Sequence, residues 1–116
     1  MTDNDSITRR TALTAAAAGA GAAAFGGSEA MAQAASRKTF VLVHGAWHGG
    51  WCWRRVADIL ESKGHKVYTP TLTGVADRSH LLSKEVVLDT HITDIVNLIK
   101  WEDLKDVCLV AHSYGG

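Results

Sequence analysis

The order of apolar and amphipathic segments is the feature that most constrains the fold of this 116-residue chain. Two continuous apolar runs, 39–44 and 107–111, read as strands buried on both faces of a parallel sheet. A third strand is predicted at 66–69, where Pro70 ends it. Parallel strands need crossover connections, and the two intervening segments are long enough to supply them as helices.

Both intervening segments have helical periodicity. The first follows a glycine-rich stretch and is expected to end at Gly64; its apolar positions are Cys52, Trp53, Val56, Ile59 and Leu60. The second is expected to begin at a Thr90 cap, with Asp94 in its first turn; its apolar stripe is Ile92, Ile95, Val96, Leu98 and Ile99. A long loop is predicted over 71–83. The sequence therefore predicts an α/β fold with a parallel β-α-β-α-β sheet covered by helices on its faces.

Residues 1–34 differ in composition from the rest and are predicted to be an export signal, leaving 35–116 to fold. A polar start with Arg9 and Arg10 precedes an Ala/Gly-rich stretch and then Ala32-Gln33-Ala34. The arginine pair and the weakly apolar stretch resemble a twin-arginine signal, which implies a periplasmic or secreted product. A stable membrane span is not expected, because about 20 strongly apolar residues are needed to cross a bilayer.

Charge and cysteine content narrow the expected partners. Twelve basic residues balance twelve acidic ones, so neither nucleic acid nor an anionic membrane is expected as a partner. A neutral small molecule, such as an ester, is a more plausible substrate for a chain with balanced charge. Cys52 and Cys108 lack metal-site spacing and are expected to be small packing residues, although a disulfide between them stays open.

A serine follows the last apolar run immediately. We call His112–Gly116 the serine turn. Small residues two positions before and after Ser113, namely Ala111 and Gly115, suit a sharp strand-to-helix turn that exposes a strained, reactive hydroxyl. Ala111 stands where glycine is usual, which weakens the motif.

A second motif follows the first apolar run. We call His44–Trp51, with the sequence HGAWHGGW, the glycine loop. Backbone amides in such a loop can point inward to bind an oxyanion. Together, the segments 40–53 and 107–116 resemble the α/β-hydrolase superfamily, particularly its compact branch of plant methyl esterases, hydroxynitrile lyases and bacterial carboxylesterases. Residues 69–74 are also similar to that branch.

This resemblance implies roles for individual residues. Ser113 would attack an ester carbonyl to form an acyl-enzyme, and the backbone N–H groups of Ala46 and Tyr114 would bind the oxyanion. The family's acid and histidine follow the nucleophile in chain order, so this chain alone is expected to be inactive. The fold implies no metal and no organic cofactor.

The remaining histidines and tryptophans are expected to be mainly structural. All six histidines are interpreted as structural or loop residues, with a smaller chance that His48 lines the substrate pocket. Trp51 and Trp53 are expected to pack the first helix against the sheet, whereas Trp47 is a candidate pocket residue.

The sequence bears on three alternatives to a serine esterase. A phosphate-binding loop is disfavoured, because Trp51 and Cys52 stand where a Walker motif has Lys and Ser/Thr. A hydroxynitrile-lyase-like activity is disfavoured, because Gly45-Ala46 lacks the hydroxyl residue that those enzymes tend to carry. A non-catalytic, truncated remnant with an exposed sheet edge stays open.

Overall fold

The computed structural model describes residues 36–116, so the predicted export signal at 1–34 lies outside the described residues. Residues 37–116 form one compact unit. Its strands are β1 (Thr39–Val43), β2 (Lys66–Tyr68) and β3 (Val107–Ala111), and its α-helices are α2 (Arg54–Ser62) and α3 (Leu88–Trp101). Short 3₁₀ helices cover Gly50–Trp53, Ala76–Leu81 and Ser113–Gly115.

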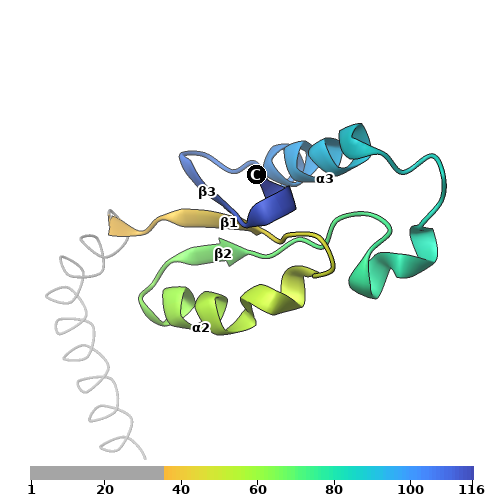
Figure 1. Cartoon of the computed structure of the whole chain (residues 1–116). Coiled ribbons are helices and arrows are strands. Elements are labelled where there is room, and N and C mark those ends of the chain that lie inside the picture. Colours follow the sequence, from red (N-terminus) through yellow and green to blue (C-terminus); the bar gives the residue numbers. More distant parts are fainter. Residues whose placement is uncertain (1–35) are drawn as a thin grey trace, which may run out of the picture. The chain divides into compact units, whose positions relative to one another are not determined.

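The three strands form a parallel sheet in the order β2-β1-β3. Thr39 pairs with Lys66 on one side and with Val107 on the other, so β1 is the central strand. The helices α2 and α3 lie on opposite sides of this sheet (Figure 1). The predicted α/β fold with a parallel β-α-β-α-β order is therefore confirmed.

The core lies between β1 and α3. Val41, Val43 and Leu72 are almost fully buried. The predicted stripe of the second helix supplies three of their partly buried neighbours, Ile95, Leu98 and Ile99. Alternate residues of β1 thus face the same helix, as the two-residue repeat of a strand requires.

The helix boundaries follow local backbone chemistry. After α2 the chain turns at Gly64, whose φ of 88° favours glycine, so the predicted end is confirmed. The prediction that Thr90 begins the second helix was wrong, because α3 starts at Leu88 and Asp89, rather than Asp94, is the acidic residue of its first turn. Thr90 still contributes to this end, since its Oγ1 accepts a hydrogen bond from the Val87 N–H at 3.1 Å.

Strand β3 departs from the expectation that it is buried on both faces. Cys108, Leu109 and Ala111 are all exposed, Leu109 by 56%. The reason is its position at the edge of the described sheet, where β1 is its strand neighbour. The packing role expected of Cys108 was therefore wrong for the described residues, whereas Cys52 is half-buried; both thiols are free.

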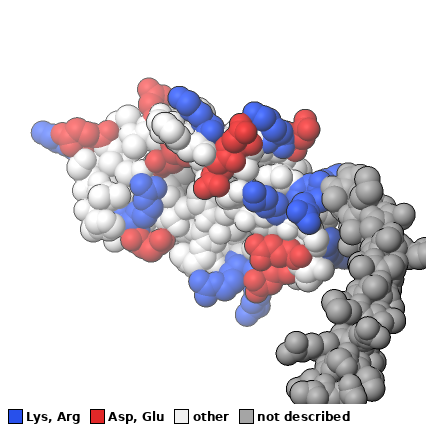
Figure 2. Space-filling view, turned by 180° about the vertical axis from the view of Figure 1, so that it is seen from behind, with Lys and Arg blue, Asp and Glu red and all other residues white. Residues whose placement is uncertain are grey.

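The surface of the described unit mixes charges of both signs. Seen from behind in Figure 2, Lys and Arg side chains are interspersed with Asp and Glu. Within residues 36–116, no helix is both long and apolar enough to cross a membrane.

Candidate active site

The serine turn has the strained backbone that its sequence predicts. β3 continues its ladder by one residue, because the His112 N–H donates to the Val43 carbonyl at 3.1 Å. Ser113 then adopts a φ of 54°, in the left-handed region that non-glycine residues seldom occupy. A short 3₁₀ turn follows, in which the Gly115 N–H donates to the His112 carbonyl at 3.0 Å. The abrupt change in direction leaves Ser113 exposed.

Steric limits explain the small residues around Ser113. A Cβ on Gly115 would lie 2.7 Å from the His44 carbonyl oxygen and 2.9 Å from Val43 Cγ1, closer than real Cβ contacts. A Cβ on Gly116 would be 3.4 Å from its nearest neighbour and 4.0 Å from Ala111 Cβ. Glycine is thus required at 115, while the alanine at 111 is accommodated.

The glycine loop lies directly beside the serine turn. A Cβ on Gly45 would be 2.9 Å from His112 Nδ1 and 3.1 Å from Ser113 Cβ. β1 and β3 are parallel neighbours, so the segments that leave their carboxyl ends meet at one edge of the sheet. Within residues 36–116, neither the Ala46 nor the Tyr114 N–H donates a backbone hydrogen bond. Both amides therefore lack a backbone acceptor among these residues.

His44 holds the start of the glycine loop. Its side chain is 1% exposed, with Nδ1 2.8 Å from the Gly45 carbonyl and Nε2 3.0 Å from the Leu72 amide nitrogen. The carbonyl can only accept and the amide can only donate, which assigns the proton to Nδ1. His44 is therefore structural, as expected, and it joins β1 to the loop after β2.

An apolar cavity of about 190 Å³ opens beside the glycine loop and the serine turn. Ala46, Trp47 and Tyr114 are among its lining residues, together with His44, Gly45, Leu72, Val75 and His91. Trp47 is 96% exposed and has a φ of 67°, so it stands at the rim. A cavity of this size suits a compact apolar group of a small molecule.

His48 is not one of the described residues that line this cavity. Its Nδ1 lies 3.0 Å from the Ala46 carbonyl oxygen, and its ring centroid is 5.7 Å from that of Trp51 and 6.3 Å from that of His112. His48 therefore shapes the backbone of the glycine loop. The packing role expected of Trp51 was wrong, because its side chain is 56% exposed, whereas Trp53 is half-buried.

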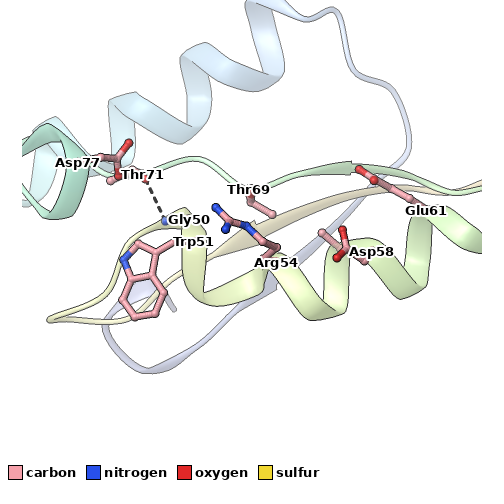
Figure 3. A pocket seen from close by; sticks show the side chains of 9 residues that line it. Gly50, Trp51, Arg54, Asp58, Glu61, Thr69, Thr71 and Asp77 are labelled. Atoms are coloured by element: carbon pink, nitrogen blue, oxygen red, sulfur yellow. Dashed lines mark hydrogen bonds between the residues drawn. The ribbon is translucent and has the colours of Figure 1, made fainter.

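A more polar pocket of about 430 Å³ runs along α2, and no residue of the serine turn lines it. Arg54, Asp58 and Glu61 line it from α2, and Asp77 lines it from the loop after β2 (Figure 3). The dashed bond in Figure 3 joins the Gly50 N–H to Thr71 Oγ1, 2.9 Å away. Thr71 Oγ1 in turn donates to Asp77 Oδ1 at 2.9 Å, which fixes the loop against the glycine loop.

Sequence reasoning missed a polar cluster that joins the loop after β2 to α3. Asp94 accepts hydrogen bonds from the Thr73 N–H at 2.6 Å and from Thr73 Oγ1 at 2.7 Å. His91 reaches the Thr73 carbonyl and the Tyr114 hydroxyl, both at 2.8 Å. These residues lie about twenty positions apart in the chain, so no local pattern signals their contact. In the described part of the chain, no group of three or more His, Cys, Asp or Glu side chains is placed to hold a metal ion.

Comparisons with known proteins agree with this geometry. The model of the alpha/beta hydrolase family matches residues 40–116. The chain is 60% identical over 77 residues to the carbendazim hydrolyzing esterase of Nocardioides sp. (strain SG-4G), covering 66% of this chain and 32% of that protein. It is 42% identical over 78 residues to methyl jasmonate esterase 1 of Vitis vinifera, covering 66% of this chain and 30% of that protein.

A solved structure of an alpha/beta-hydrolase also matches this chain. An extracellular alpha/beta-hydrolase from a Paenibacillus species, described as a structural and functional homologue of tobacco salicylic acid binding protein 2, matches with a TM-score of 0.61 and 37% identity. The match covers 67% of this chain and 31% of that one. The chain thus spans about a third of the length of the curated relatives and structures that it matches.

Proposed function

The chain belongs to the alpha/beta hydrolase family, and from that premise we propose that it contributes the nucleophile and the oxyanion site of a serine-dependent carboxylic ester hydrolase. The observation that carries this proposal is the strained turn at Ser113, with its φ of 54°, seated beside Gly45 of the glycine loop. In this family a serine exposed on such a turn acts as a nucleophile.

The proposed reaction uses two groups of the described site. Ser113 Oγ attacks the ester carbonyl, and the electron pair of the C=O bond moves to the oxygen. The N–H groups of Ala46 and Tyr114 stabilise that negative charge, and collapse of the intermediate expels the alcohol and leaves an acyl group on Ser113. Loss of one such donor typically costs about 2.7 to 4 kcal/mol of barrier.

The proton of Ser113 requires a general base, which returns it to the departing alkoxide; a water molecule then cleaves the acyl–Ser113 bond and releases the acid. Among residues 36–116, no side chain is hydrogen-bonded to the Ser113 hydroxyl, and the histidines that form hydrogen bonds form them with other partners. In this family the base and its acid follow the nucleophile in chain order. We therefore propose that residues 1–116 alone do not hydrolyse esters.

The proposed substrate is a small, neutral ester. The cavity of about 190 Å³ beside Ala46 and Tyr114 is apolar and would accept one compact group of the substrate. The names of the relatives suggest substrates for a first panel, namely carbendazim, methyl jasmonate and, as a reporter, p-nitrophenyl acetate.

A fluorophosphonate probe tests the mechanism. The protein expressed from its complete gene should be labelled on the peptide that contains Ser113 and should hydrolyse at least one panel ester, whereas its Ser113→Ala variant should do neither. An active Ser113→Ala variant would contradict the proposal. The intact mass of the labelled species, compared with the 12.4 kDa of residues 1–116, tests whether more chain is needed for activity.

We also propose that the protein is exported. The supporting features are the order Arg9-Arg10, Ala/Gly-rich stretch and Ala32-Gln33-Ala34, and the likeness to a relative described as extracellular. N-terminal sequencing of the protein from a periplasmic or culture fraction should start near Ala35. Recovery only from the cytoplasm with residues 1–34 intact would contradict export.

A further inference from the structure

His91 connects three segments that are distant in sequence. Its Nε2 lies 2.8 Å from the Thr73 carbonyl oxygen, and its Nδ1 lies 2.8 Å from the Tyr114 hydroxyl oxygen. Because the carbonyl can only accept, Nε2 carries a proton, and in the neutral ring Nδ1 accepts from the Tyr114 O–H. The two rings meet edge to face, with centroids 5.7 Å apart and planes at 89°.

Asp94 fixes the Thr73 carbonyl that His91 contacts. Both the N–H and the hydroxyl of Thr73 donate to this carboxylate, whose side chain is only 16% exposed. His91 and Asp94 are three residues apart on α3 and so lie on one face of the helix. The helix thus holds Thr73 with one side chain and reaches Tyr114 with the other.

Tyr114 lies where the serine turn meets the cavities beside it. Its N–H follows the strained Ser113 directly and is one of the two proposed oxyanion donors. Tyr114 also lines two apolar cavities, one of about 190 Å³ and another of about 570 Å³, and it shares both with Leu72 and His91. Its hydroxyl oxygen lies 2.8 Å from His91 Nδ1, and this hydrogen bond is the contact through which His91 can restrain the Tyr114 side chain.

We propose that His91 is a positioning residue that holds Tyr114, and thereby both the oxyanion donor and one wall of the smaller cavity. This inference rests on the proposed esterase function. The sequence predicts His91 to be a structural or loop residue, whereas this proposal gives it a role in supporting the transition state. Misplacement of such a group by about 1 Å can lower a rate about 100-fold.

The test compares five variants of the protein expressed from its complete gene: His91→Leu, His91→Gln, Tyr114→Phe, the double variant His91→Leu/Tyr114→Phe, and His80→Leu. His80 is an exposed histidine of the 3₁₀ helix Ala76–Leu81 and serves as the matched control. For each, kcat and KM are measured with a short-chain and a bulky acyl ester, together with the rate of fluorophosphonate labelling and thermal unfolding.

We expect His91→Leu and Tyr114→Phe each to lower kcat by about tenfold or more, with KM for the short-chain ester changing by less than about threefold. The kcat of the double variant should be no lower than that of the more impaired single variant, because the two substitutions break the same hydrogen bond. His91→Gln should recover most of kcat, since its amide can donate to Thr73 and accept from Tyr114. In His91→Leu and Tyr114→Phe, kcat/KM for the bulky ester should rise relative to that for the short-chain ester, because Tyr114 is no longer held against the smaller cavity. His80→Leu should match the wild type in all of these measurements.

Three results would overturn the proposal. One is an unchanged kcat in folded His91→Leu. Another is a double variant whose kcat falls by the product of the two single-variant factors. The third is a fall in kcat that follows thermal stability alone and is not restored by His91→Gln. Failure of the esterase function itself is recognised separately, because wild-type protein would then be unlabelled or Ser113→Ala would stay active, and the oxyanion role of Tyr114 would be rejected with it.

Discussion

A methyl group on Gly115 would lie 2.7 Å from the carbonyl oxygen of His44, which means that the serine turn is seated directly against the end of β1. This contact joins the two motifs that carry the proposed chemistry. It also explains why the position two residues after Ser113 has no side chain, since two of the three nearest atoms, the carbonyl oxygens of His44 and Val43, belong to backbone and cannot move aside cheaply.

We expect Gly115→Ala to lower the free energy of unfolding by about 2 kcal/mol, the usual scale of overpacking, and to reduce labelling of Ser113. Gly116→Ala is the matched control, because its new Cβ would be 3.4 Å from the nearest neighbour. That control should stay within about 0.5 kcal/mol of the wild type in urea unfolding. Equal effects of the two substitutions would refute the steric explanation.

His44→Leu should be destabilising through an unpaired amide. The variant leaves the Leu72 N–H without the Nε2 acceptor 3.0 Å away, in a buried site, and such a loss costs about 1–3 kcal/mol. In His65→Leu, by contrast, water can replace the exposed bond from the Lys38 N–H to His65 Nδ1. Urea unfolding should therefore show the larger loss for His44→Leu, and the reverse order would contradict the buried hydrogen-bond role.

Asp94→Ala should lower the free energy of unfolding by about 1–3 kcal/mol, because Thr73 loses the acceptor of two hydrogen bonds. The control is Lys105→Ala, which removes an ion pair with Asp103 whose side chains are 76% and 83% exposed. Exposed pairs contribute little, so this control should change stability by about 0.5 kcal/mol or less. If both variants unfold alike, Asp94 does not anchor the loop.

Burial raises the pKa of the Cys52 thiol above its ordinary value of 9.0. The folded protein keeps this proton at a pH where the unfolded chain loses it, so the associated stability is present below pH 9.0 and declines as the pH rises above that value. In a Cys108→Ser variant, the iodoacetamide reaction of Cys52, followed by mass spectrometry, should have its midpoint above pH 9.0. The same protein in urea is the control, and a midpoint that urea does not lower would contradict the effect of burial.

Much of the fold could be predicted because it depends on local patterns. Continuous apolar runs indicated β1 and β3, the three- and four-residue spacing indicated α2 and α3, and the positive φ of Gly64 matches the predicted helix end. The errors arose where neighbours decide the outcome. Thr90 lies inside α3, where its N–H donates to the Val87 carbonyl, and Cys108 is exposed because β3 is an edge strand of the described sheet.

In the candidate site, too, some features follow from local sequence and others depend on tertiary packing. The serine turn could be predicted from local residue types, because the strained Ser113 and the close approach of Gly115 require particular residues at a constant spacing. Only the tertiary structure decided how His91, Thr73 and Asp94 support Tyr114. Such contacts join side chains about twenty residues apart, and their geometry exists only after the sheet and α3 have packed together.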